Sequence, residues 1–183
     1  MKQTALLIVD LQNDYFPGGR WELSNTEAAA AQAAAMLDHF REQKLPVIHV
    51  RHEFPTQDAP FFAPDSEGAE IHPSEKNIQG EPVIVKHQIN SFKETGLKEV
   101  LDESNVGDLV ICGAMSHMCI DAVARAAHDL GYNCTVIHDA CATLDVAFES
   151  VSVPAKQVHA AVMAALDFAY ANVISATEFL SKN

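Results

Sequence analysis

The sequence predicts an α/β fold: a three-layer sandwich with a mostly parallel central sheet of about six strands and helices on both faces, in a Rossmann-like arrangement. Short apolar runs alternate along the whole chain with longer stretches of helix-forming residues, the pattern of a parallel sheet with crossover helices. The apolar runs are continuous, as in strands that are buried on both sides. A chain of 183 residues suffices for one sizeable core, so we expect a single domain spanning residues 1–183.

In the first half of the chain, the predicted strands are residues 4–9, 47–50 and 82–86. The alanine-rich stretch at 26–44 predicts a helix between the first two, because alanine has the highest helix propensity. Residues 52–81 combine proline, charge and aromatics without periodicity. We interpret them as a long excursion within the domain, since the strand pattern resumes directly afterwards. Loops of this length are usually functional or disordered.

The same alternation continues in the second half. It predicts a helix near 95–103, a strand at 108–113, a helix at 119–131, a strand at 133–138, a helix at 154–170, and a last strand and tail within 172–180. Small residues cover much of the helix at 154–170. This composition indicates close packing, either on the sheet or on a partner helix.

Three reactive residue types follow three of the predicted strands. Asp10 ends the first strand, Lys86 ends the third, and the segment "GAMSHMC", which closes with Cys119, follows the fourth. In parallel α/β sheets the ligand crevice lies beyond the carboxyl ends of the strands. We therefore expect Asp10, Lys86 and Cys119 to meet at one edge of the sheet.

These three residues together have the chemistry of a cysteine nucleophile. A free thiol has a pKa near ~8.5 and is mostly protonated at neutral pH. We expect the helix N-terminus and the Lys86 ammonium to lower the pKa of the Cys119 thiol, and Asp10 to accept its proton and later return it to a leaving amine. Free N–H groups in the bend before the helix can bind an oxyanion. The arrangement predicts acyl transfer through a thioester, on a carbon–nitrogen bond of an amide or ureide.

Taken one at a time, these residues have simpler structural explanations. Asp10 alone is typical of a turn or cap, Lys86 of a solvated strand end, and Cys119 of a small buried hydrophobe. Their coincidence at strand ends favours catalysis. The other cysteines lie on or just after predicted strands and are expected to fill the core: Cys112, Cys134 and Cys141.

Four segments resemble the isochorismatase-like cysteine hydrolase superfamily: "LLIVDLQNDYFPGG", "KHQINSF", "GAMSHMCIDAVARAAHDLGY" and "VIHDACAT". The first and third segments are specific and the last is supportive. The likeness extends in order from about residue 4 to residue 180. The superfamily includes nicotinamidases, N-carbamoylsarcosine amidohydrolases, ureide hydrolases and isochorismatases.

The resemblance implies a role for each reactive residue. The catalytic aspartate of the superfamily falls on Asp10, its lysine on Lys86 and its nucleophile on Cys119. It also implies a cis peptide bond between Ala114 and Met115, which would turn the N–H groups of Met115 and Cys119 toward one oxyanion position.

The resemblance also narrows the substrate and the cofactor. Isochorismatases proper lack the nucleophilic cysteine, so the presence of Cys119 disfavours isochorismate as substrate. Nicotinamidases carry a metal-binding Asp-x-His pair, and the corresponding segment here, "HVRHEFPTQDAPFF", lacks that pair. The remaining histidines do not have the spacing of a metal site: His49, His52 and His72. We expect no metal and no other cofactor, and nicotinamidase activity is disfavoured.

Aromatic residues in the loops that should border the crevice are candidates for substrate contacts, because substrate pockets are mainly apolar. They are Phe16, Trp21, Phe61, Phe62 and Phe92. Packing of the loops or of a subunit interface would explain them equally well. His117, two residues before Cys119, is a candidate for substrate contact, since the role of the base is already assigned to Asp10.

Composition excludes some classes of partner. The chain has 12 basic and 25 acidic residues, and its net charge is −13. Without a basic cluster to neutralise phosphates, we expect no nucleic-acid and no membrane partner, but a small-molecule substrate. No apolar run approaches the ~20 residues that span a bilayer, and the N-terminal segment lacks a signal-peptide pattern, so we expect a cytoplasmic protein. The resemblance implies a homo-oligomer, a dimer or larger.

Two other functional classes remain open. A catalytically silent binding or scaffold protein could keep the fold, although retention of all three reactive residues is unexpected for it. A redox-active thiol protein would need a resolving cysteine near Cys119. The neighbour in sequence, Cys112, is expected inside a strand.

Overall fold

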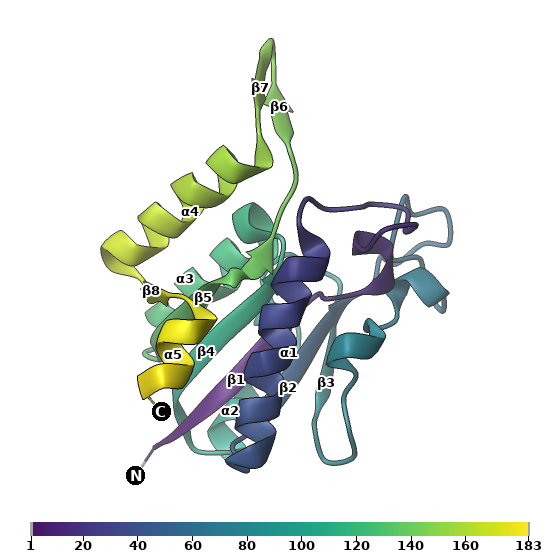
Figure 1. Cartoon of the computed structure of the whole chain (residues 1–183). Helices are drawn as coiled ribbons and strands as arrows, with labels where there is room; N and C mark the ends of the chain where they lie inside the picture. The colour runs from purple at the N-terminus through teal and green to yellow at the C-terminus, as the bar shows by residue number, and fades with distance from the viewer. Residues whose placement is uncertain (1, 183) are drawn as a thin grey trace.

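The computed structural model describes residues 2–182 and contains the predicted sheet (Figure 1). Six strands lie in the order β3-β2-β1-β4-β5-β8, and every neighbouring pair is parallel. The strands are β1 (Gln3–Val9), β2 (Val47–His52), β3 (Val83–Lys86), β4 (Val106–Ala114), β5 (Asn133–Ala142) and β8 (Asn172–Ile174). The α/β prediction is therefore confirmed.

Helices cover both faces of this sheet. They are α1 (Thr26–Glu42), α2 (Leu97–Glu103), α3 (Asp121–Asp129), α4 (Ala155–Ala169) and α5 (Ala176–Lys182). Side chains of β1 alternate between two cores: Leu6 and Ile8 pack with α1 and α5, and Leu7 and Val9 pack with α2, α3 and α4. No helix among residues 2–182 is long and apolar enough to cross a membrane.

Two segments differ from the prediction. Residues 143–153, which carried no predicted element, contain the antiparallel hairpin β6 (Val146–Phe148) and β7 (Val151–Val153), which extends away from the sheet (Figure 1). The expected tail after the last strand forms α5 instead. The Asp139 carboxylate accepts a hydrogen bond from the N–H of Ala176 at 2.8 Å, and the Ser175 hydroxyl accepts one from the N–H of Glu178 at 3.1 Å. These contacts satisfy first-turn N–H groups and allow a short helix.

The turn around Cys119 also differs from the prediction. A π-helical turn, Ser116–Ile120, precedes α3, so Cys119 lies inside this turn and not at the start of the α-helix. The Met115 carbonyl accepts the N–H groups of both Met118 (3.1 Å) and Ile120 (3.2 Å), which widens the turn. Gly113 has φ of +130°, and a Cβ atom there would overlap the Val9 carbonyl of the neighbouring strand. Glycine is therefore required where β4 leads into the turn.

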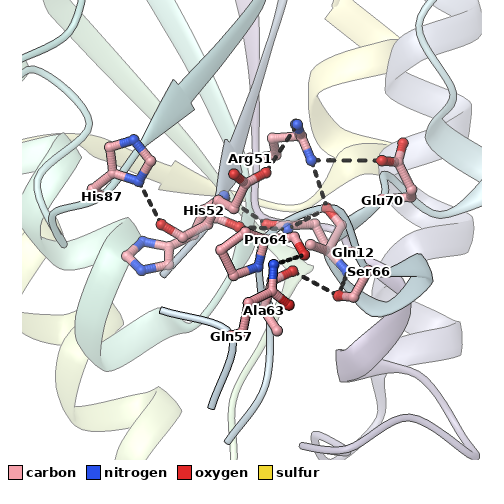
Figure 2. Close-up of polar contacts among 11 residues, drawn as sticks. Gln12, Arg51, His52, Gln57, Ala63, Pro64, Ser66, Glu70 and His87 are labelled. Atoms are coloured by element: carbon pink, nitrogen blue, oxygen red, sulfur yellow. Dashed lines mark hydrogen bonds and ion pairs between the residues drawn. The ribbon is translucent and has the colours of Figure 1, made fainter. Parts of the chain in front are cut away.

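Buried polar contacts hold the excursion between β2 and β3 against the carboxyl edge of the sheet (Figure 2). The Gln12 side chain is fully buried. Its amide N–H groups donate to the carbonyls of His52 (2.8 Å) and Ala69 (2.7 Å), and its carbonyl oxygen accepts the N–H of His52 (2.7 Å). Arg51 forms an ion pair with Glu70 at 3.7 Å. The excursion is thus a fixed wall beside the strand ends.

Candidate active site

Asp10, Lys86 and Cys119 meet at the carboxyl edge of the sheet. The Lys86 Nζ lies 2.8 Å from the Asp10 Oδ2 and donates a hydrogen bond to the Cys119 Sγ at 3.3 Å. Because β2 lies between β3 and β1, the long lysine side chain has to span β2 to reach Asp10. All three side chains are buried; Asp10 and Lys86 are 0% exposed and Cys119 is 3% exposed. The structure brings together the three residues that the strand-end rule selected.

Asp10 has an unusual backbone conformation. Its φ is +54°, in the left-handed region that few non-glycine residues adopt. Strained residues of this kind cluster at functional sites, where the surrounding structure holds them. The conformation ends β1 abruptly and keeps the Asp10 carboxylate at the strand end, beside the Lys86 ammonium.

The protonation state of the thiol differs from the expectation. Burial raises the pKa of the Cys119 thiol, and the negative charge of Asp10 raises it further, while the Lys86 ammonium opposes these effects only in part. The pKa is therefore raised well above its ordinary value, where we had expected it to be lowered. The resting Cys119 is a protonated thiol.

Lys86 remains a cation despite its burial. Burial acts to lower the pKa of Lys86, but the Asp10 carboxylate and the Cys119 sulfur outweigh it, and the pKa is raised overall. The ammonium and the carboxylate form a buried ion pair beside a neutral thiol. Such a pair is costly to break, because removing either partner leaves an uncompensated charge in the interior.

The segment before the nucleophile contains the other predicted site residues. The peptide bond between Ala114 and Met115 is cis. Met115 directly precedes the π-helical turn, and Cys119 lies within that turn. The assignment of their N–H groups to an oxyanion site stays a prediction.

His52 is a residue of the site that sequence reasoning missed. Its Nδ1 lies 3.0 Å from the Lys86 Nζ, and the side chain is 4% exposed. In the sequence, His52 stands out only as a possible metal ligand, because the apolar run that predicts the second strand ends at Val50. The strand continues to His52, which pairs in register with Lys86. Had the second strand been predicted to end at His52, the expectation that strand-end residues meet at the carboxyl edge would have included His52, as it included Lys86.

Tyr15 is a second missed residue. It is 2% exposed, and burial, together with the charge of Asp10, raises the pKa of its phenol. Tyr15 belongs to a group of rings that we call the aromatic cluster: Tyr15, Trp21, Phe54, Phe61 and Phe62. His52 packs edge-on against Phe54, with centroids 4.6 Å apart. Trp21, 39% exposed, stacks on Phe61 at 4.8 Å and is the outer member of the cluster.

The remaining predicted contact residues have partners of their own. Phe16 is buried and stacks on His72, with ring centroids 3.6 Å apart. Phe92 stacks on Tyr132, which directly precedes β5 at the opposite edge of the sheet. The His117 Nδ1 lies 2.6 Å from the Thr143 hydroxyl. These contacts do not test substrate binding, so the assignment of Phe16, Phe92 and His117 to substrate contacts stays a prediction.

Two further expectations concern cysteines and metals. The other three cysteines are free and buried, as expected for core residues: Cys112, Cys134 and Cys141. Across the described part of the chain, no group of three or more His, Cys, Asp or Glu side chains is placed to hold a metal ion.

Known proteins resemble this chain over nearly its whole length. The family model for the isochorismatase domain matches residues 4–178. The uncharacterised isochorismatase family protein YddQ of Bacillus subtilis (strain 168) is 51% identical over 177 residues, 97% of this chain and 98% of its own. A solved structure from Oleispira antarctica, described as an isochorismatase hydrolase, matches with a TM-score of 0.96 at 61% sequence identity. The match covers 98% of this chain and 97% of the chain in that structure. A streptothricin hydrolase from Streptomyces noursei is 33% identical over 151 residues, 78% of this chain and 50% of its own.

Proposed function

Since the chain belongs to the isochorismatase family of hydrolases, we propose that it cleaves a carbon–nitrogen bond of a small amide or ureide through a thioester on Cys119. The observation that carries this proposal is the contact of the Lys86 ammonium with both the Asp10 carboxylate and the Cys119 sulfur. A thiol and a carboxylate, both in contact with one ammonium, are the parts that covalent acyl transfer requires.

In the proposed reaction the buried thiol is activated only when substrate is bound. Asp10 accepts the thiol proton while the Cys119 sulfur forms a bond to the substrate carbonyl carbon. Lys86 stabilises the sulfur as it loses its proton, because the ammonium already donates to it. The carbon–nitrogen bond then breaks, and Asp10 gives its proton to the departing amine. Water, deprotonated by Asp10, hydrolyses the thioester to a carboxylic or carbamic acid and restores the thiol.

The carbonyl oxygen acquires negative charge in each addition step. We propose that the N–H groups of Met115 and Cys119 stabilise this charge by hydrogen bonds. Met115 directly precedes the turn that carries the sulfur, and Cys119 lies in it. We assign the aromatic cluster to the apolar wall against which the substrate binds, with Trp21 at the solvent edge of the cluster. Since Cys119 is only 3% exposed, substrate reaches it by displacing side chains of this wall.

A substrate panel with matched variants tests the proposal. The probes are streptothricin, because a relative is a streptothricin hydrolase, together with nicotinamide and N-carbamoylsarcosine from the wider superfamily. Wild-type protein is expected to hydrolyse at least one probe, and Cys119→Ala to lower kcat by about 10⁴-fold or more. Cys134→Ala, which removes a buried thiol elsewhere in the core, is the control and should keep its activity.

Acid quenching during turnover should trap an acyl group on the Cys119 peptide, detected by mass spectrometry. Hydrolysis that persists in Cys119→Ala would contradict covalent catalysis. A wild-type protein that binds a probe without turning it over would instead identify a silent binding protein of the same fold.

A further inference from the structure

The Lys86 ammonium has a third neighbour that the proposed reaction does not use. Besides the Asp10 Oδ2 at 2.8 Å and the Cys119 Sγ at 3.3 Å, the His52 Nδ1 lies 3.0 Å away. An ammonium has three N–H donors. One ion pair and two hydrogen-bonding neighbours surround the ammonium from three sides and hold it between the carboxylate and the sulfur.

The contact with the Lys86 ammonium determines which ring nitrogen of His52 carries the proton. Because the ammonium can only donate, Nδ1 must carry the lone pair, and the ring proton lies on Nε2. Burial and the charge of Lys86 lower the pKa of His52 to about 4, while Asp10 after β1 partly opposes this effect and His87 after β3 adds to it. At neutral pH His52 is therefore the uncharged acceptor that Lys86 needs.

His52 is itself held from several sides. It pairs in register with Lys86 across β2 and β3, and Phe54 packs against its ring. Gln12 bonds both the N–H and the carbonyl of His52, at 2.7 and 2.8 Å (Figure 2). Gln12 follows Asp10 by two residues in the chain. The loop that begins with Asp10 thus fixes His52, which in turn contacts the lysine paired with Asp10.

We propose that His52 is a positioning residue that holds the Lys86 ammonium between the Asp10 carboxylate and the Cys119 sulfur. Its effect on turnover rests on the proposed function. Its effect on the acidity of the thiol does not, because Lys86 favours the thiolate whether or not a substrate exists. The two consequences are measured separately.

Three substitutions of His52 distinguish the effect of its hydrogen-bond acceptor from the effect of its side-chain volume. His52→Leu keeps the volume and removes the acceptor. In His52→Asn the amide oxygen can occupy the place of Nδ1, whereas in His52→Gln the amide lies farther along, near Nε2. His87→Leu is the control, because His87 directly follows Lys86 but its ring bonds the Glu53 carbonyl at 2.6 Å.

The first measurement is the rate at which chloroacetamide alkylates Cys119 at pH 8.5, read by mass spectrometry of the Cys119 peptide. His52→Leu and His52→Gln should lower this rate about tenfold, equivalent to raising the pKa of the thiol by about one unit, and His52→Asn should restore it to within about threefold. Simple loosening of the structure would expose the sulfur and raise the rate. An equal or faster rate in a folded His52→Leu, or equal rates in His52→Asn and His52→Gln, would overturn the proposal. If His52→Leu does not fold, the comparison of His52→Asn with His52→Gln decides.

The second measurement is hydrolysis of the best probe of the panel. His52→Leu should lower kcat about 100-fold with little change in KM, because the lysine acts on the reacting sulfur and not on substrate binding. His87→Leu should match wild type in both measurements. If no probe is hydrolysed, the proposed function fails while the alkylation rates still test His52. Hydrolysis with wild-type kcat in His52→Leu would leave the proposed function intact and overturn the role of His52.

Discussion

At the scale of single residues, the site depends on where one proton lies. The Asp10 carboxylate and the Lys86 ammonium form a buried pair, and the Cys119 thiol beside them remains protonated because burial and Asp10 raise its pKa. The nucleophile is therefore not stored as a thiolate. Its ionisation is coupled to transfer of the proton to Asp10, which also has to return a proton to the departing amine. One carboxylate thus both suppresses the resting thiolate and enables the reaction.

This coupling gives opposite predictions for reactivity and turnover in Asp10→Asn. Because the Asp10 carboxylate raises the pKa of Cys119, its neutralisation should lower that pKa and increase alkylation of Cys119 at pH 8 by about tenfold or more. Hydrolysis of the best probe should fall about 1,000-fold, since the proton acceptor is lost. Lys86→Met is the matched comparison and should slow alkylation, because it removes the positive charge. Slower alkylation in Asp10→Asn would disprove this account.

The triad could be predicted from sequence and the state of its thiol could not. Asp10, Lys86 and Cys119 follow apolar runs, and a parallel sheet gathers such strand ends at one edge. The pKa of the thiol depends instead on its burial and on contacts near 3 Å, which the sequence does not contain. His52 was missed for a different reason: Arg51 and His52 are polar, so the apolar run ends two residues before the strand does.

At the scale of elements, the excursion between β2 and β3 is an ordered wall that carries a buried carboxyl. Glu75, in the 3-10 helix Pro73–Glu75, is 0% exposed. Its Oε2 accepts a hydrogen bond from the Ser74 hydroxyl, while its Oε1 has no hydrogen-bond partner among the described residues. Burial raises the pKa of Glu75 to about 7, against 4.5 for a free glutamate. The folded protein therefore retains this proton over a range in which the unfolded chain has lost it.

The excursion should lose stability as pH rises. Between pH 4.5 and 7 the folded state binds more protons than the unfolded state, so the free energy of unfolding falls with pH, by about 3 kcal/mol in total from this group. Glu75→Gln keeps a neutral side chain and should remove most of this decrease, leaving the variant more stable than wild type at pH 8 and similar at pH 4.5. Urea unfolding at both pH values measures the difference. Glu67→Gln, an exposed position in the same excursion, is the control.

If wild type and Glu75→Gln show the same change in stability between the two pH values, the Glu75 carboxyl is not the group responsible.

The shortest elements of the fold could not be predicted from the sequence. The 3-10 helices and the strands β6 and β7 have three residues each, too few to show a period in the sequence. The 3-10 helix Glu67–Ala69 also depends on a contact with a residue far away in the chain, since the Gln12 amide bonds the Ala69 carbonyl, and this contact exists only once the sheet has assembled.

At the scale of the whole molecule, the site lies where the sheet changes direction. From β1 the strand order runs through β2 to β3 on one side, and from β4 through β5 to β8 on the other. The neighbouring strands β1 and β4 therefore flank the topological switch point, where α/β sheets place their ligand crevice. Asp10 follows β1, and the segment to Cys119 follows β4. This placement follows from the strand–helix alternation, which is why the fold and the triad were both predictable from the same pattern.

Large apolar side chains lie exposed on α4 and on the hairpin that leads into it. Phe168 on α4 is 91% exposed, and Phe148 and Val151 of the hairpin are 77% and 60% exposed. Single exposed apolar residues are ordinary, but a projecting hairpin and an adjoining helix that both present them are typical of an interface. The small residues of α4 would allow a second helix to approach closely. The expectation of a homo-oligomer therefore has a place to be tested: the exposed apolar side chains of α4 and of the hairpin.

Light scattering coupled to size-exclusion chromatography tests this assembly. Wild-type protein is expected to have the mass of a dimer or larger, and the double variant Phe148→Glu with Phe168→Glu to have the mass of a monomer. The reason is that a carboxylate buried in an apolar interface lacks a partner and costs several kcal/mol, about as much as a weak dimer gains. Ile78→Glu, at a residue of the excursion that is 53% exposed, is the control and should leave the mass unchanged. A monomeric wild type, or a double variant with unchanged mass, would mean that α4 and the hairpin do not hold copies of the chain together.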